Sequence, residues 1–430
     1  MKRKMTSIIT FWEWVKKLIF IILERVMGKK NNLIAGLDIG SSKVCTLIAH
    51  LNEEGGFEII GYGETPSKGL KNGVVVNIES TVEAIQKAVE DAEVMAGEEI
   101  DNVIVAIGGP HIKGQSSHGL VIINDKEVKK KDKQRVIDNA TAVAIPRDKE
   151  IIHVIPQEYI IDDQGGIKDP VGLAGVRLEA KVHIVTGATT SIQNVVKSCN
   201  KAGLEIEEIV LQQLASAEAV LTEDEKELGV ALIDIGAGTT DIAIFYNGSI
   251  KFSSMFGLGG DHITNDIAVG FHISKKEAEN MKIKHGCACS ELVKSDEMVK
   301  VERLGGNENV PVSKKILSEI IEPRVMEILS IAKQEIKKSG VGELIASGIV
   351  LTGGTTLLEG IDKIARQVFP VPVRLASPGD VGSGIVEKVK NPAYATVVGL
   401  CLYGTKMDRN YAVSSSSFMK NVINWIQEFV

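Results

Sequence analysis

Two stretches of the chain alternate apolar runs with a short polar turn in the same way. Residues 34–50 read IAGLDIGSSKVCTLIAH, and residues 229–245 read GVALIDIGAGTTDIAIF. In each, an apolar run ends in Asp-Ile-Gly, a small, hydroxyl-rich turn follows, and a second apolar run begins. Such a pattern predicts a β-strand, a tight turn and a second β-strand. The two units begin at Asp38 and Asp234, far enough apart for a whole domain to lie between them.

A third glycine turn lies in GIVLTGGTTLLEGI, residues 348–361. We expect a strand over Ile349–Thr352 and a helix after the turn, so that Gly353 and Gly354 let the backbone approach a flat base or a sugar at a helix N-terminus. The sequence contains neither the Walker pattern GxxxxGK[ST] nor a GxGxxG turn after a strand, the signatures of two other classes of nucleotide site.

The composition of the turns suits phosphate and Mg²⁺. Their glycines can adopt positive φ and leave no Cβ in the way, so backbone N–H groups can form a nest around an anion. The neighbouring hydroxyls and Lys43 add donors and a positive charge, and an aspartate opening each turn suits an octahedral Mg²⁺ that keeps most of its waters. One such turn alone is commonly an ordinary hairpin. Two matching copies and a third glycine turn favour a phosphate site.

The C-terminal segment FMKNVINWIQEFV, residues 418–430, predicts an amphipathic helix behind the polar spacer YAVSSSS. Lys420 is offset by Glu428 and the terminal carboxylate, so attraction to anionic lipid would be almost purely apolar. The helix can dock on the protein's own core or on a membrane. Membrane contact is expected through the apolar side chains Phe418, Val422, Ile423, Trp425, Ile426 and Phe429.

Composition and charge limit the class of protein. A chain of 430 residues predicts about three domains, and 44% apolar with 24% charged residues is typical of a soluble protein. A net charge of −7 gives no general attraction to nucleic acid. Five scattered cysteines indicate reduced thiols in a cytoplasmic protein. In residues 1–30, charged side chains interrupt every apolar run, so a membrane-spanning helix is not expected there.

The three turns resemble the nucleotide motifs of the actin, heat-shock ATPase and sugar-kinase superfamily. DIGSSKVC is similar to its first phosphate motif, DIGAGTTD to its second, and LTGGTTLLEG to its adenosine motif. Further stretches narrow the resemblance to the FtsA family of bacterial division proteins, from about residue 32 to residue 404. They are HVIPQEYIID, DPVGLAGVRLEAKVHIVTG, VLTEDEKELGV, KIKHGCA, EIIEPR and PAYATVVGL.

The resemblance implies an α/β, actin-like ATPase fold in which two lobes enclose a nucleotide cleft and an α+β subdomain is inserted in the first lobe. The implied ranges are 32–106 and 187–219 for the core of the first lobe and 107–186 for the inserted subdomain. Residues 220–270 and 345–404 would form the core of the second lobe, with 271–344 as its outer subdomain. Residues 1–31 would be an N-terminal extension, 405–417 a linker, and 418–430 the membrane helix.

Carried over residue by residue, the resemblance implies ATP and Mg²⁺ as cofactors. Asp38 and Asp234 would hold Mg²⁺ through water. Gln212 in LQQLAS would orient the attacking water, which suits slow hydrolysis at most. Glu279 and Lys282 in AENMKIK would approach the ribose and base, with a solvated helix face as the alternative. The three turns would supply the other nucleotide contacts: Asp38, Gly40, Ser41, Ser42, Lys43, Asp234, Gly236, Gly238, Thr239, Thr240, Gly353, Gly354 and Thr355.

A partner site is implied in the outer subdomain. Arg324 in EIIEPR would meet the acidic C-terminal tail of the tubulin-like protein FtsZ, because a guanidinium can hold a carboxylate with two hydrogen bonds. The alternative is an ordinary charge on a helix surface. Pro323 lies in an otherwise helical run and is expected to start or kink a helix.

These expectations describe a scaffold of cell division that polymerises, recruits FtsZ and other division proteins, and lies peripherally on the cytoplasmic side of the inner membrane. Two alternatives stay open: a small-molecule kinase of the same fold, with Asp234 or Asp241 as base, and an actin-like scaffold of pilus assembly. Relatives normally begin near LIAGLDIG, so Met27 is the expected initiator. The alternative is that residues 1–26 form a second membrane helix.

Overall fold

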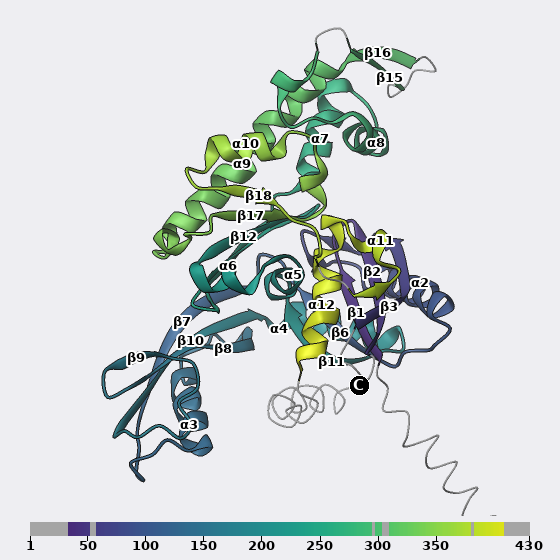
Figure 1. Cartoon of the computed structure of the whole chain (residues 1–430). Coiled ribbons are helices and arrows are strands. Elements are labelled where there is room, and N and C mark those ends of the chain that lie inside the picture. Colours follow the sequence, from purple (N-terminus) through teal and green to yellow (C-terminus); the bar gives the residue numbers. More distant parts are fainter. Residues whose placement is uncertain (1–32, 52–56, 295–296, 303–308, 380–381, 408–430) are drawn as a thin grey trace, which may run out of the picture.

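The computed structural model describes residues 33–51, 57–294, 297–302, 309–379 and 382–407. Figure 1 shows two lobes, a small separate sheet at the lower left and a subdomain carrying β15 and β16 at the top. The expected N-terminal extension with Met27, most of the expected linker and the expected membrane helix lie outside the described residues. Within the described residues, no helix is long and apolar enough to cross a membrane.

A six-stranded sheet forms the core of the first lobe, in the strand order β11-β6-β1-β2-β3-β19. Helices α2 (Ile78–Ala96) and α4 (Thr189–Lys201) bury apolar side chains against one face. Asn77 caps α2 by accepting a hydrogen bond from the Ser80 backbone N–H. The strands of the sheet are β1 (Leu33–Ile39), β2 (Lys43–Leu51), β3 (Phe57–Pro66), β6 (Asn102–Ile107), β11 (Glu205–Leu211) and β19 (Ser383–Gly384), with a short hairpin of β4 (Leu70–Lys71) and β5 (Val74–Val75).

The second lobe is built on a five-stranded sheet that repeats the first. Its order is β14-β13-β12-β17-β18, from β12 (Val230–Ile235), β13 (Thr240–Tyr246), β14 (Ser249–Phe256), β17 (Ile349–Thr352) and β18 (Val373–Leu375). β1 pairs antiparallel with β2 and parallel with β6, and β12 pairs antiparallel with β13 and parallel with β17. The strand–turn–strand predictions for 34–50 and 229–245 are therefore confirmed, and both lobes use one supersecondary unit.

Helices α5 (Gln212–Val220) and α12 (Ala395–Lys406) pack on each other, and α12 also covers β1, β2 and β6 of the first sheet. Because β19 pairs with β3 and α12 packs on β1, β2 and β6, residues 383–406 belong to the first lobe. The expected range 345–404 for the second lobe is therefore wrong at its C-terminal end. Short helices complete this region: α6 (Glu223–Leu228), η4 (Pro392–Tyr394) and α11 (Val386–Val389).

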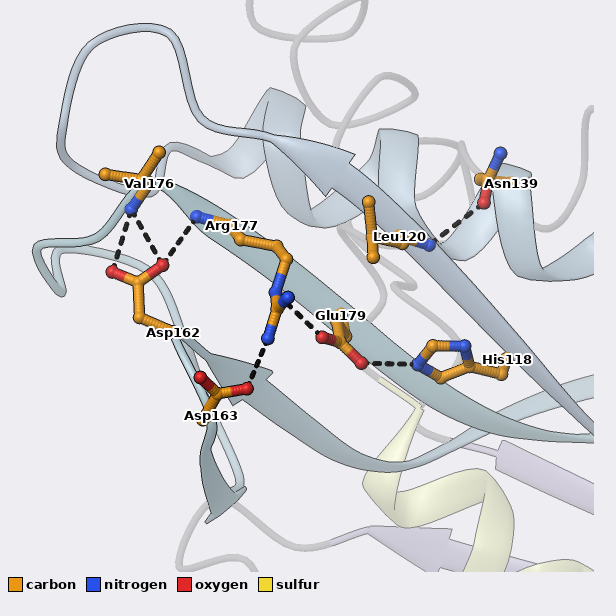
Figure 2. Close-up of polar contacts among 8 residues, drawn as sticks. All are labelled: His118, Leu120, Asn139, Asp162, Asp163, Val176, Arg177 and Glu179. Carbon is orange, nitrogen blue, oxygen red and sulfur yellow. Dashed lines mark hydrogen bonds and ion pairs between the residues drawn. The ribbon is translucent and has the colours of Figure 1, made fainter.

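The inserted subdomain is a four-stranded antiparallel sheet with one helix. The order is β7-β10-β8-β9, and α3 (Lys130–Thr141) covers the buried face. Figure 2 shows the opposite face, where an ion-pair ladder crosses the strands: Arg177 and Glu179 on β10 pair with each other, and Glu179 contacts His118 on β7 at 2.7 Å. The strands are β7 (Lys113–Ile122), β8 (Lys149–Ile161), β9 (Gln164–Ile167) and β10 (Arg177–Ala188).

Polar contacts join the inserted subdomain to edge strand β14 of the second lobe. The Gln157 side chain donates to the Ile250 carbonyl at 2.7 Å, and the Ser249 hydroxyl donates to the Gln157 carbonyl at 2.9 Å. His183 Nε2 and Ser253 Oγ lie 2.8 Å apart in a buried position. The inserted subdomain, covalently part of the first lobe, is thus also held by the second.

The expected outer subdomain, 271–344, contains α8 (Lys275–His285), a hairpin of β15 (Met298–Glu302) and β16 (Asn309–Ser313), and α9 (Lys314–Lys338). The neighbouring helices α7 (Gly260–Phe271) and α10 (Ile361–Val368) pack on α9, and α8 packs on α7. Ser313 caps α9 by accepting from the Lys315 N–H. Pro323 lies inside this continuous helix, so the prediction that a helix starts there is wrong. Short 3₁₀ turns are η1 (Ser290–Leu292), η2 (Gly342–Leu344) and η3 (Gly354–Leu357).

Gly399 in α12 provides a test of the packing between α5 and α12. A Cβ on Gly399 would lie 1.7 Å from the Ala215 carbonyl oxygen, a backbone atom that cannot rotate away. Alanine improves helix propensity by ~1 kcal/mol, but overpacking a tight helix contact costs about 1–3 kcal/mol. Gly399→Ala should therefore lower the thermal unfolding temperature, measured by calorimetry. Gly404→Ala in the same helix is the control, because its new Cβ would meet only side-chain methyl groups of Ile104 and Ile34. A larger loss for Gly404→Ala would contradict this account.

Candidate functional site

A cavity of about 390 Å³ opens between the two lobes, within the size range of small-molecule sites. The turns after β1, β12 and β17 line it together, although they are far apart in sequence. Of the nucleotide contacts expected from the sequence, all but Thr240 line this cavity, and Gln212 lines it too. Thr240 is fully buried and its hydroxyl donates to the Leu258 carbonyl at 2.8 Å, so its side chain stabilises the turn instead.

The two Asp-Ile-Gly turns have the same backbone geometry. The Gly40 N–H donates to the Lys43 carbonyl at 2.9 Å, and the Gly236 N–H donates to the Thr239 carbonyl at 2.9 Å. The turns also meet across the cavity, because a Cβ on Gly238 would lie 2.6 Å from Ser41 Oγ. Two turns closed by the same backbone hydrogen bond therefore meet across the cavity.

The third turn is packed directly against the second. Gly353 has φ +92°, in the region that favours glycine, and a Cβ there would lie 2.3 Å from Asp234 Oδ1 and 2.5 Å from the Ile235 carbonyl oxygen. The Thr355 hydroxyl donates to the Gly236 carbonyl at 2.8 Å. Only glycine at position 353 allows this close approach, which fixes the third turn beside Asp234.

Three carboxylates lie at the end of the cavity where the two turns meet. Burial raises the pKa of Asp38 to about 7, with Lys43 opposing the rise and Asp234 adding to it. Burial raises the pKa of Asp234 to about 6, against a 2.7 Å hydrogen bond donated by the Ser216 hydroxyl. The third carboxylate is Asp241 on β13. Burial, together with the charge of Asp234, raises the pKa of Asp241 well above the ordinary value. The cluster is thus short of positive charge.

Asp241 was expected only as a base of the kinase alternative, and its place in this cluster was missed. It is fully buried and does not line the cavity. Thr239 donates to one carboxylate oxygen at 3.2 Å, and the other oxygen has no hydrogen-bond partner among the described residues. The sequence signal was available, since an aspartate inside an apolar strand that follows a phosphate turn needs a partner.

Lys43 does not extend freely into the cavity. Its ammonium group forms a 2.9 Å ion pair with Glu64 and lies 3.4 Å from the centroid of the Tyr394 ring. The hydroxyls of Tyr62 and Tyr394 donate to the same Glu64 oxygen at 2.8 and 2.9 Å. Burial acts to raise the pKa of Glu64, but these hydrogen bonds and Lys43 outweigh it and hold the pKa below the ordinary value. Sequence spacing gave no signal for this cradle, which fixes the position of the Lys43 charge.

Lys282 and Glu279 on α8 line the cavity, yet their polar groups also hold α7. The Lys282 ammonium donates to the Gly260 carbonyl at 3.0 Å and to the Thr264 hydroxyl at 2.8 Å, and it lies 2.6 Å from Glu279. All three of its N–H bonds therefore have acceptors. Lys282 is 8% exposed, so the alternative of a solvated helix face is wrong for it.

Gln212 and an apolar wall complete the cavity. Gln212 begins α5, and a Cβ on Gly108 would lie 2.4 Å from its Oε1, so the amide lies directly over that glycine. Ile283, Leu357 and Leu358 line the cavity beside Gly354. These three side chains could cover a flat base. Sequence analysis missed them because apolar residues carry no motif of their own.

Arg324 lies outside the cavity, on α9. Its guanidinium already binds a carboxylate in the expected two-bond manner, because Nε and Nη2 donate to the two Asp266 oxygens at 2.6 and 3.0 Å. Nη1 contacts Glu327. The position is thus suited to a carboxylate, and a carboxylate of the same chain occupies it.

Two family models match the chain. The model for cell division protein FtsA matches residues 231–399, and the model for the SHS2 domain inserted in FtsA matches residues 109–186. The second match covers most of the four-stranded sheet with α3.

Several relatives are similar over nearly the whole chain. The cell division protein FtsA of Pseudomonas aeruginosa is 47% identical over 393 residues, covering 91% of this chain and 94% of the relative. That of Neisseria meningitidis is 43% identical, with 89% and 93% covered. That of Escherichia coli strain K12 is 38% identical over 418 residues, with 94% and 99% covered.

Solved structures with low sequence identity share the fold. The PilM-PilN type IV pilus biogenesis complex contains a chain with a TM-score of 0.64 and 16% identity, covering 87% of this chain and 98% of that one. MreB5 of Spiroplasma citri bound to ADP gives a TM-score of 0.53 and 16% identity, with 88% and 98% covered. These likenesses, with the inserted SHS2 domain, confirm the predicted actin-like α/β fold.

The buried carboxylate of Asp241 predicts a pH-dependent gain in stability on substitution. Because its pKa is raised in the folded protein, the penalty for its charge is absent below the unfolded pKa and grows as pH rises toward the folded pKa. Asp241→Asn should therefore raise the thermal unfolding temperature of the nucleotide-free protein in EDTA, more at pH 8 than at pH 5. Asp101→Asn, at an exposed position, is the control. A gain of equal size at both pH values would refute this explanation.

Proposed function

The chain belongs to the FtsA family of cell division proteins, and on this premise we propose that it is a nucleotide-dependent scaffold of cell division. In this role it binds ATP with Mg²⁺ between its lobes, polymerises, holds the C-terminal tail of FtsZ and recruits other division proteins. Residues 418–430 attach it peripherally to the cytoplasmic face of the inner membrane.

The observation that supports the nucleotide site is the meeting of two similar glycine turns across one cavity. Backbone N–H groups in such turns carry partial positive charge and suit phosphate oxygens. Ser41 Oγ accepts a 2.9 Å hydrogen bond from the Gly73 N–H, which leaves its hydroxyl hydrogen available to a phosphate. Gly354 and the apolar wall of Ile283 and Leu357 lie where a base can enter the same cavity.

The donor set fits Mg²⁺, which prefers carboxylate and water oxygens. Among the described residues, Asp38 and Asp234 are the two aspartates that line the cavity, and burial raises the pKa of both, so a bound cation would offset their buried charge. When bound, Mg²⁺ supplies charge that neutralises phosphate oxygens. Asp241 is buried next to this pair, and one of its carboxylate oxygens has no hydrogen-bond partner among the described residues, so a cation would also offset its charge.

The site supports a conformational role for ATP more than rapid chemistry. Gln212 can orient a water molecule but is not a strong base, so hydrolysis is slow at most. A kinase would need Asp234 or Asp241 as its base. Asp241 is buried and does not line the cavity, and the Asp234 carboxylate already accepts a hydrogen bond from the Ser216 hydroxyl. The pilus alternative rests on a likeness of fold at 16% identity, whereas relatives at 38–47% identity are FtsA proteins.

Nucleotide binding should stabilise the protein by mass action. A ligand at one hundred times its Kd adds ~2.7 kcal/mol to the free energy of unfolding. Saturating ATP with Mg²⁺ should therefore raise the thermal unfolding temperature, and Asp38→Asn should remove the part of the shift that depends on Mg²⁺. Asp101→Asn should keep the full shift. If millimolar ATP with Mg²⁺ leaves the unfolding temperature of the unaltered chain unchanged, the nucleotide proposal is wrong.

Membrane attachment is tested by flotation with liposomes. Fully burying a large apolar side chain contributes ~1.5–3 kcal/mol, and an interfacial helix realises only part of this. One helix should bind weakly, and an ATP-dependent polymer presenting many should bind firmly. Trp425→Glu on the apolar stripe should abolish flotation in ATP, while Gln427→Glu, with the same change of charge off the stripe, should not.

The flotation experiment is run with the full chain and with a chain that begins at Met27. Because the tail lacks net positive charge, added salt should leave flotation largely intact. Unchanged flotation of the Met27 chain after deletion of residues 418–430 would disprove the tether.

A further inference from the structure

We propose that Asp266 is a competitor, built into this chain, for the carboxylate of an acidic partner at Arg324. An acidic peptide then binds by displacing Asp266 from the guanidinium, and Asp266 sets how strongly the site holds its partner. The inference rests on the proposed function, because it concerns the same FtsZ-tail site.

The geometry of the pair is that of a recognition contact. Nε and Nη2 of Arg324 on α9 reach both oxygens of Asp266 on α7, at 2.6 and 3.0 Å, and Nη1 contacts Glu327. A planar guanidinium binds carboxylates in this forked arrangement. With these donors engaged, a partner carboxylate can gain the two-bond contact only where Asp266 gives it up.

The pair is accessible enough for such an exchange. The Arg324 side chain is 26% exposed and the Asp266 side chain 27% exposed, so solvent reaches both. Ion pairs with this degree of access contribute little net stability, because water solvates each charge when the pair opens. Exchange therefore does not require the helices to separate.

The packing of α7 on α9 does not depend on the pair. Ile267 and Val325, the residues next to Asp266 and Arg324 in sequence, are at most 1% exposed and belong to the core of the second lobe. The ion pair thus lies on top of an apolar contact that is already closed. Asp266→Asn should consequently fold normally and leave Arg324 in place.

The surroundings suit a peptide with apolar side chains beside its carboxylates. Ile316, Ile320 and Arg324 follow one another at four-residue spacing along α9, and Val269 lies three residues after Asp266 on α7. Ile316 is 50% exposed and Val269 is 67% exposed. We call these five residues the α7–α9 seam. Ile320, between Ile316 and Arg324 on α9, is partly buried against the core. Two exposed apolar side chains and the cation of Arg324 therefore offer both contacts that an amphipathic acidic segment needs.

The test measures binding of a fluorescent FtsZ C-terminal tail peptide to the full chain by anisotropy, at one fixed nucleotide concentration. An ion pair of this exposure is worth up to about a fivefold change in an equilibrium constant. We therefore expect Asp266→Asn to tighten binding about three- to fivefold, with a smaller gain at high salt. Arg324→Gln should abolish binding. Glutamine is preferred to glutamate there, because Asp266 and Glu327 would repel a third carboxylate.

A matched control separates local exchange from general charge. Asp362→Asn removes the same charge from another partly exposed pair, that of Asp362 with Arg366 on α10, and should leave affinity unchanged. An equal gain from Asp362→Asn would show a long-range charge effect and overturn the proposal. Asp266→Ala provides a second variant, and the thermal unfolding temperature of each is recorded.

The outcomes distinguish this inference from the function on which it rests. If Arg324→Gln abolishes binding but Asp266→Asn leaves it unchanged or weakens it, Asp266 supports Arg324 rather than competing for it, and only the inference is overturned. If Arg324→Gln binds the peptide as well as the unaltered chain does, the FtsZ-tail site itself is not at Arg324, and both fall.

Discussion

The crowding of carboxylates between two glycine turns is the constraint on which the rest of the structure depends. Asp38 and Asp234 come from equivalent positions of the two repeated units, and the close approach of the turns at Gly238 and Ser41 brings the two carboxylates into one cavity. Burial makes their charge unfavourable, as the raised pKa values record. A bound cation would offset this unfavourable charge, and a phosphate would accept hydrogen bonds from the two turns, so both ligands would favour closure of the cleft. In the proposed function, nucleotide occupancy is therefore tied to the relative position of the lobes.

Two helices, α7 and α5, begin at the cavity and connect it to more distant parts of the molecule. α7 begins on the second turn, where the Gly260 and Asp261 N–H groups donate to the Gly236 and Ala237 carbonyls, and it carries Asp266 about two turns further on. α5 begins at Gln212 in the cavity and ends near Glu218, which binds Lys406 in the last turn of α12. Arg324 on α9 is thus connected to the cleft through Asp266 and α7, and Lys406 on α12 is connected to it through Glu218 and α5.

The sequence was most informative where chemistry is local. The repeated Asp-Ile-Gly pattern predicted the two hairpins, and with the family resemblance it predicted the polar residues of the three turns that line the cavity, because strand, turn and donor groups are neighbours in the chain. Prediction from the sequence failed where the position of a side chain depends on strand register or on contacts with distant elements. Thr240 follows Thr239 by one residue, so the two side chains face opposite ways and Thr240 enters the core. The ion pair of Arg324 with Asp266 joins two residues that are 58 positions apart in the sequence, and no local sequence pattern predicts it.

The misplaced lobe boundary has a related cause. The sequence shows α12 as an apolar helix following the second-lobe motif, and nothing local tells which sheet it covers. The packing of α12 on β1, β2 and β6 and the pairing of β19 with β3 place this part of the chain on the first lobe.

The inserted subdomain is the element best placed to report closure of the cleft. It continues from β6 and returns into α4, so it moves with the first lobe. Gln157 and His183 nevertheless bind β14, the edge strand of the second lobe. When one lobe rotates against the other, the inserted subdomain either shifts to stay in contact with both lobes or loses its contacts with β14. Because buried polar groups are costly to leave unpaired, the contacts favour discrete orientations over a continuous range. The inserted subdomain is thus tied to both lobes, through the chain on one side and through its contacts with β14 on the other.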